Sequence, residues 1–186
     1  MSKQGLFIQG AGQGAYVADE KLVASLRHLL GPEYEVQYPV MPHEEDADYE
    51  SWKLQIAQEL TALDDPVLLL GHSVGASILL KCITETDVEK TITGIFLIAT
   101  PFWSGDGWRY EGFTRLSLQK GFAAKLPKSA SLFLYHSRDD EIVPFTHLAL
   151  YAQTVPQATI RELDGCGHQL NNDLFEVAED IKSLQR

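Results

Sequence analysis

A serine that lies between two glycines is the residue of this sequence best placed for covalent chemistry. Residues 71–75 are Gly-His-Ser-Val-Gly, and they directly follow the four apolar residues 67–70. Apolar residues then continue at helical spacing, which predicts a sharp turn between a buried strand and a helix. Such a turn lifts the Ser73 hydroxyl above the sheet and places the Val74 N–H at the helix N-terminus, where an oxyanion would be stabilised. The pattern therefore predicts a nucleophilic serine.

An acid and a base follow two later predicted strands. A serine hydroxyl becomes a good nucleophile when a base accepts its proton, and the base needs an acid that fixes its tautomer. Asp140 comes shortly after the apolar segment 131–136, and His168 lies in the turn after the segment 158–163. The chain order Ser, Asp, His is the order that accompanies a strand–serine–helix turn of this kind. We expect Ser73, Asp140 and His168 to be the catalytic residues.

Alternatives remain open for the acid, the base and the nucleophile. Asp139 could be the acid in place of Asp140, or the two aspartates could cap the following helix. His168 could be a solvated loop histidine. Cys166 lies two residues before His168 and could act as a thiol nucleophile, although it has no turn of this kind and no helix N-terminus beside it.

The other histidines are expected to have no part in the chemistry. His72 lies inside the serine turn and is expected to pack there, while His136 at the end of a predicted strand is expected to be structural. The remaining three are expected on helix or loop surfaces: His28, His43 and His147.

Strands and helices alternate along the whole chain. The apolar segments predict strands at 6–8, 34–38, 67–70, 92–99, 131–136 and 158–163. Helical spacing and end signals predict helices from Asp19 to about 30, at 52–63, from the serine turn to about 85, at 145–155 and from Leu170 onward. They also predict a helix at 114–126, which Gly121 weakens. Six strands alternating with six helices predict a doubly wound α/β sheet with parallel strands. In such sheets functional residues follow the carboxyl ends of the strands.

On these residues the sequence resembles the α/β-hydrolase family, and the resemblance covers nearly the whole chain. It is most similar to the small serine hydrolases of the retinoblastoma-binding-protein-9 kind. The segment Asp140 to Pro144 is similar to the acid loop of the family, in which the aspartate lies four residues before a proline. The turn Gly-Cys-Gly-His at 165–168 is also similar to the family.

The resemblance implies a fold and an activity. The fold would be a three-layer α/β/α, minimal α/β-hydrolase fold without a large lid. The length of 186 residues separately predicts a single domain over residues 1–186. Its six-stranded parallel sheet would have the order 2-1-3-4-5-6. The activity would be hydrolysis of a carboxylic ester, thioester or amide of a small molecule through an acyl-enzyme, with no metal and no cofactor.

The loop after the first strand supports a second oxyanion donor and a rival function. Residues 9–12 are Gln-Gly-Ala-Gly, where the family usually has His-Gly-x, and matching the glycines assigns the second donor to the Ala11 N–H beside Val74. Residues 10–15 also satisfy G-x-G-x-x-A, a dinucleotide fingerprint, but the second strand ends at Pro39 without an acid for the ribose. A dinucleotide-binding oxidoreductase, and a hydrolase-like protein that only binds a partner, remain the alternatives.

Aromatic residues and glycines gather in the segment 102–113. It holds five of the eighteen aromatic residues of the chain, with three glycines among them. Because it follows a predicted strand, it leaves the sheet at the same edge as Ser73. We expect Phe102, Trp103 and Trp108 to form a short cap that binds an apolar part of the substrate. A rigid surface loop without this role is the alternative.

The composition limits the partners of this protein. The formal net charge of −11 argues against nucleic acid and anionic membranes and leaves a small-molecule substrate as the expected partner. The two cysteines, Cys82 and Cys166, do not suggest a disulfide framework. The apolar run near the N-terminus is too short for a signal peptide, so we expect a cytoplasmic protein. The sequence leaves the oligomeric state open.

Overall fold

The computed structural model describes residues 2–103 and 114–184, and its centre is one parallel six-stranded sheet. The strand order is β2-β1-β3-β4-β5-β6, and every neighbouring pair is parallel. Both features confirm the predicted α/β/α fold class and sheet order. The strands are β1 (Lys3–Ile8), β2 (Tyr34–Gln37), β3 (Val67–His72), β4 (Ile92–Ile98), β5 (Ser131–Ser137) and β6 (Thr159–Leu163).

The burial of each strand explains its residue pattern. All six residues of β3 are buried, since β3 lies inside the sheet and has helices on both faces. Leu69 belongs to the apolar core on one face, while Leu68 and Leu70 belong to the core on the other. A strand that needs apolar side chains on both faces shows a continuous apolar run. The edge strand β6 has no fully buried residue, which agrees with its alternating apolar and polar sequence.

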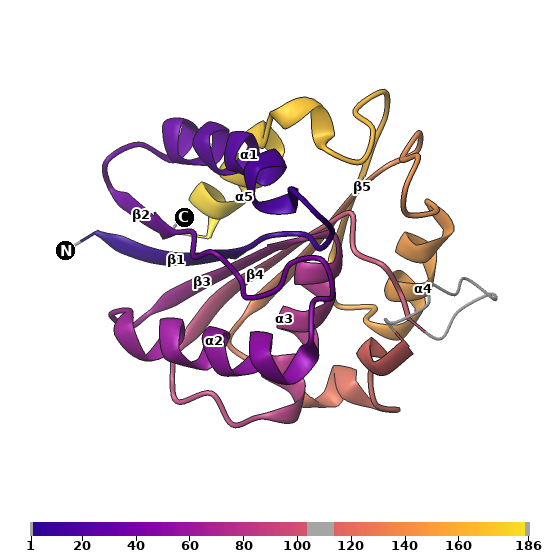
Figure 1. Ribbon diagram of the computed structural model, residues 1–186. Coiled ribbons are helices and arrows are strands. Elements are labelled where there is room, and N and C mark those ends of the chain that lie inside the picture. The colour runs from indigo at the N-terminus through magenta and orange to yellow at the C-terminus, as the bar shows by residue number, and fades with distance from the viewer. Residues whose placement is uncertain (1, 104–113, 185–186) are drawn as a thin grey trace.

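Five α-helices cover the two faces of the sheet. Figure 1 shows α1 (Ala15–Leu30) and α5 (Phe175–Ser183) on one face and α2 (Tyr49–Ala62) and α3 (Ser73–Glu85) on the other. The fifth helix, α4 (Thr146–Thr154), contributes Leu148 and Tyr151 to the apolar core shared with α2 and α3. Within the described residues, no helix has the length and apolar character needed to cross a membrane.

The first helix begins earlier than predicted. Asp19 was expected at its start, but α1 begins at Ala15, and Asp19 lies inside the helix with its side chain buried. The helix extends because Gly14, its N-cap, adopts a left-handed backbone with φ of 83°, and because Glu44, from a distant loop, accepts hydrogen bonds from the N–H groups of Gly14 and Tyr16. Contacts so far apart in sequence leave no trace in the local residue pattern.

Two predicted helices are only partly helical, so five α-helices are present in the described ranges instead of six. The segment 114–126 forms two short 3₁₀ turns, η1 (Thr114–Leu116) and η2 (Phe122–Lys125), because Gly121 has a left-handed φ of 80°. At Leu170 the chain forms a 3₁₀ turn, η3 (Leu170–Asn172), whose three residues all have positive φ. A continuous helix is impossible there, and α5 starts five residues later than expected.

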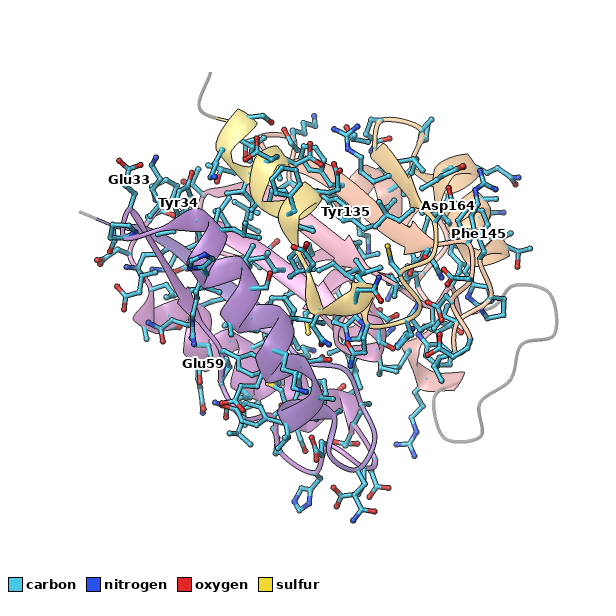
Figure 2. The ribbon with its side chains drawn as sticks, turned by 90° about the horizontal axis from the view of Figure 1, so that it is seen from above. Glu33, Tyr34, Glu59, Tyr135, Phe145 and Asp164 are labelled. Carbon is cyan, nitrogen blue, oxygen red and sulfur yellow. The ribbon has the colours of Figure 1, made fainter. Side chains whose placement is uncertain are left out.

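The carboxyl ends of the strands lie at one edge of the molecule. In Figure 2, Tyr34, which begins β2, is at the opposite end from Asp164, which directly follows β6. Phe145, which precedes α4, lies near Asp164. The loops that carry the candidate residues therefore leave the sheet at the same end.

Candidate active site

The serine turn joins β3 to α3 without a linker. Ser73 is the first residue of α3 and has a left-handed φ of 51°. A Cβ on Gly71 would lie 2.6 Å from the Ala76 Cα, and a Cβ on Gly75 would lie 1.8 Å from the Gln9 carbonyl oxygen. Both positions therefore require glycine. The crowding at Gly71 is the expected strand–helix contact, whereas Gly75 is constrained by the loop after β1.

Asp140 contacts the imidazole of His168. The His168 Nδ1 lies 2.9 and 3.0 Å from the two carboxylate oxygens of Asp140. The same carboxylate accepts hydrogen bonds of 2.8 Å from the N–H groups of Ile142 and Val143. Because the Asp140 side chain is fully buried and bonded on both oxygens, it fixes the orientation of the imidazole.

His136 is a further partner of Asp140. Its Nε2 lies 3.1 Å from a carboxylate oxygen of Asp140 and 3.0 Å from the Val143 carbonyl oxygen. Burial alone would raise the pKa of Asp140, but the hydrogen bonds from His136 and His168 outweigh it and lower the pKa. Asp140 is therefore an anion that can balance a positive charge on His168. This contact with Asp140 is part of the structural role expected for His136. The two residues are four positions apart in the sequence, and that spacing could have indicated the contact.

Asp139 supports the turn that carries His168. Its exposed carboxylate accepts hydrogen bonds from the Ser137 hydroxyl and from the N–H groups of Cys166 and Gly167, the latter two at 3.2 Å. It is Asp140, and not Asp139, that the structure places against the imidazole. The two neighbouring aspartates thus have different contacts, one to the backbone of the turn and one to the histidine ring.

Cys166 lines a different pocket from the one that Ser73 lines. Its Sγ donates to the Asp164 carbonyl oxygen at 3.3 Å, and it lines a hollow with Tyr135 and Leu174. Ser73 and His168 line another pocket together. This arrangement disfavours the thiol as the nucleophile.

The loop after β1 is anchored on both sides of Ala11. The Gly10 N–H donates to Asp19 at 2.7 Å, and the Gly12 N–H donates to the Glu44 carbonyl oxygen at 2.7 Å. In the described part of the chain, the Ala11 N–H donates no hydrogen bond. Val74 is the second residue of α3, where an N–H has no acceptor within the helix. Ala11 and Val74 line the same pocket as Ser73.

Glu44 binds the N-terminus of α1 through its carboxylate. One oxygen accepts from the Gly14 N–H at 2.6 Å, and the other accepts from the Tyr16 N–H and from Gln9 Nε2, both at 2.8 Å. The hydrogen bond from Tyr16 is the largest cause of the lowered pKa of Glu44. In dinucleotide-binding proteins a phosphate group takes this place at the helix N-terminus. Since a carboxylate of the chain occupies it, the geometry disfavours the dinucleotide alternative.

Replacing Glu44 by glutamine is expected to destabilise the loop that carries Ala11. A glutamine amide has only one oxygen to accept hydrogen bonds. Its NH₂ group would therefore face at least one of the donors that now bond to the Glu44 carboxylate, and that hydrogen bond would be lost. We expect the melting temperature to fall by about 2–4 °C, the size of a lost helix cap of about 1 kcal/mol in a chain of this length. Thermal unfolding of Glu44→Gln and of Asp46→Asn, an exposed acid of the same loop, measures this effect. Equal melting temperatures for both variants would contradict the anchoring role of Glu44.

The pocket at Ser73 has a volume of about 430 Å³. It is lined by small residues of the β1–α1 region and by residues from the loops after β4 and β5, beside Ser73 and His168. The apolar residues that line it include Ala11, Ala15, Ala18, Pro101, Trp103, Ile142 and Val143. A larger groove of about 570 Å³ runs between α2 and α3 and contains none of the candidate residues.

The expected cap residues have different positions. Trp103 is buried and lines the pocket. Phe102 instead packs edge-on against the Tyr151 ring, with centroids 4.9 Å apart, and is not brought to the pocket. Its N–H donates to His147, which is buried and not on the surface as expected. Trp108 lies outside the described residues.

The parallel sheet in the order 2-1-3-4-5-6 and the strand–serine–helix turn define an α/β-hydrolase fold. Residues 29–184 match the family model described as serine hydrolase, and the chain belongs to that family. No curated protein matches the sequence.

Solved structures share this fold over almost the whole chain. The ydeN gene product of B. subtilis is 22% identical, with 99% of each chain covered and a TM-score of 0.74. CarC, a serine hydrolase involved in carbazole degradation, is 14% identical, with 99% of this chain and 91% of that chain covered and a TM-score of 0.75. Est1E of Butyrivibrio proteoclasticus is 16% identical, with 99% and 87% covered and a TM-score of 0.72. The closer resemblance to the retinoblastoma-binding-protein-9 kind stays an expectation.

Proposed function

We propose that this protein hydrolyses a carboxylic ester, or a thioester or amide, of a small molecule through an acyl-enzyme on Ser73. The observation that carries the proposal is the pairing of His168 with the buried carboxylate of Asp140, in the loops beside Ser73. His168 and Ser73 line one pocket, so a substrate carbonyl bound there would be within reach of both.

The contacts support the following role for each group. His168 Nδ1 faces Asp140, which leaves the lone pair of Nε2 to accept the Ser73 proton. The Ser73 oxygen then attacks the carbonyl carbon, and the Ala11 and Val74 N–H groups stabilise the oxyanion. The C–O bond to the leaving group breaks as His168 returns the proton to the departing alcohol. Water, deprotonated by His168, then attacks the acyl carbon, and the C–O bond to Ser73 breaks as His168 returns the proton to the Ser73 oxygen, which releases the acid.

A fluorophosphonate probe tests this proposal directly. The probe forms a phosphorus–oxygen bond with an activated serine and releases fluoride. We expect peptide mapping to find the adduct on Ser73, together with hydrolysis of p-nitrophenyl esters. A protein that only binds a partner would give neither result.

The acyl preference is measured with a graded panel of substrates. The panel compares p-nitrophenyl esters of increasing chain length with thioesters and aminoacyl amides. A structure of Est1E has ferulic acid bound, so a feruloyl ester belongs in the panel. We propose that Trp103 contacts the apolar part of the substrate, because it is the expected cap residue that lines the pocket.

We expect the pocket to favour neutral over anionic substrates. Among the described residues that line it, none is lysine or arginine, and the exposed Glu45 adds negative charge. Two like charges about 4 Å apart in water repel by about 1 kcal/mol, or about fivefold in kcat/KM. The kcat/KM for p-nitrophenyl butyrate is therefore expected to be about fivefold higher than that for p-nitrophenyl hemisuccinate, or more.

Two variants and a change in salt concentration test whether Glu45 causes the preference for the butyrate ester. Glu45→Gln is expected to narrow the ratio of the two kcat/KM values, and added salt to narrow it in the wild type. Asp46→Asn is the matched control, because Asp46 is an exposed acid that does not line the pocket. A preference for the hemisuccinate would contradict this prediction.

A further inference from the structure

His72, inside the serine turn, and Asp19, in α1, form a buried pair. The side chains are 2% and 1% exposed, and the His72 Nδ1 lies 2.9 Å from each of the two Asp19 carboxylate oxygens. On the other side of the ring, Nε2 lies 3.1 Å from the carbonyl oxygen of His168. His72 is therefore the residue before Ser73 in sequence and a hydrogen-bond partner of the backbone of His168.

Both ring nitrogens of His72 face atoms that can only accept hydrogen bonds. An ionised carboxylate and a backbone carbonyl have no proton to donate. A neutral imidazole carries one N–H and could satisfy only one of them. Both contacts are hydrogen bonds only if each nitrogen carries a proton, which makes the ring an imidazolium paired with the Asp19 anion.

Asp19 connects this ring to two further loops. Its carboxylate accepts from the Gly10 N–H at 2.7 Å and from Gln169 Nε2 at 3.0 Å. Gly10 precedes Ala11, the proposed oxyanion donor, and Gln169 follows His168. The pair thus joins the loop after β1, the serine turn and the loop that carries His168.

We propose that His72 is an imidazolium held by Asp19, and that the two are positioning residues which fix the oxyanion loop and His168 relative to Ser73. Neither residue touches the substrate in this role. They act through the backbone N–H of Gly10, which precedes the proposed oxyanion donor Ala11, and through the backbone carbonyl of His168, the proposed base. The kinetic consequence of this inference rests on the proposed function, whereas the charge of His72 does not.

The charges around His72 agree with this assignment. The groups that face the ring are Asp19, the His168 ring at a centroid distance of 4.7 Å and, further away, Asp140. Burial alone would lower the pKa of His72, but the attraction and hydrogen bond of Asp19 outweigh it and raise the pKa. As an imidazolium–carboxylate ion pair, the two residues together have no net charge.

Nuclear magnetic resonance measures the charge of His72 independently of activity. Two-bond ¹H–¹⁵N correlations of the ¹⁵N-labelled protein report the protonation of each ring nitrogen, and His72→Gln assigns the signals. We expect both His72 nitrogens to carry protons at pH 7. A neutral tautomer at pH 7 would overturn the proposal, whatever the activity of the enzyme.

Kinetics of Asp19→Asn measure the positioning role. We normalise kcat to the fraction of protein whose Ser73 the fluorophosphonate labels. This normalised kcat is expected to fall at least tenfold in Asp19→Asn, while KM changes less than threefold. Glu20→Gln, an exposed acid next in sequence on α1, is expected to leave both values unchanged. A merely structural role would lower the melting temperature or the fraction of labelled serine and leave kcat per labelled serine within twofold of the wild type. That result would overturn the positioning role, while a wild type that cannot be labelled would overturn the proposed function instead.

Discussion

Replacement of Ser73 by alanine is expected to lower kcat for p-nitrophenyl esters by about 10⁴ to 10⁶, the range for loss of a catalytic serine. The substitution removes only the oxygen that would form the acyl-enzyme and leaves the turn and its two glycines in place. Fluorophosphonate labelling is expected to disappear with the activity. Circular dichroism and the melting temperature then show whether the fold is retained.

Ser77 provides the matched control. It is a buried serine one turn later in α3, and its hydroxyl donates to the Pro101 carbonyl oxygen at 3.0 Å. Ser77→Ala is expected to cost about 1 kcal/mol of stability for this hydrogen bond while labelling at Ser73 continues. Near-normal turnover by Ser73→Ala would show that the nucleophile is another residue.

Replacement of Asp140 by asparagine is expected to lower kcat by about 10³ to 10⁴, as for acids that orient a catalytic histidine. The amide could donate to His168 Nδ1 and would then favour the tautomer whose Nε2 cannot accept the serine proton. Steady-state kinetics of Asp140→Asn and Asp139→Asn compare the two neighbouring acids. We expect a smaller loss for Asp139→Asn, because Asp139 contacts the backbone of the turn and not the ring.

The stability of the same variants provides a second measurement. The lowered pKa of Asp140 means that its ionised form stabilises the fold above the ordinary aspartate pKa of about 3.9. This contribution is lost as the pH falls through the lower pKa of the folded state. The free energy of unfolding of Asp140→Asn is therefore expected to depend less on pH in acid than that of the wild type.

The kinetic comparison decides which aspartate is the acid. A larger loss of kcat in Asp139→Asn than in Asp140→Asn would reverse the assignment.

The sheet, and the edge at which the candidate residues lie, could be predicted because local sequence determines the strands and their order along the chain. The apolar run of β3 follows from burial on both faces, and parallel strands place the loops of Ser73, Asp140 and His168 at one edge. The helix over 114–126 was predicted wrongly, since the left-handed conformation of Gly121 has the larger effect. Gly121 in the middle of the predicted helix was the sequence signal against a continuous helix.

The supporting contacts could not be predicted, because they join residues far apart in sequence. Asp19 has the features of a helix cap when only its neighbours are considered, and its partner His72 lies 53 positions away. Glu44 stands in an acidic loop whose sequence gives no sign that it binds the N-terminus of α1. Only the folded arrangement brings these acids to the loops around Ser73.

The backbone of Ser73 has a consequence for efforts to make this protein more heat-resistant. A side chain held at a φ of 51° costs about 1 kcal/mol or more, and glycine adopts this conformation without that cost. A library screened only for survival at high temperature would therefore enrich glycine at position 73, which has no hydroxyl. Selection for thermal tolerance and selection for turnover act in opposite directions at this one position, so directed evolution of this scaffold has to score both in every round.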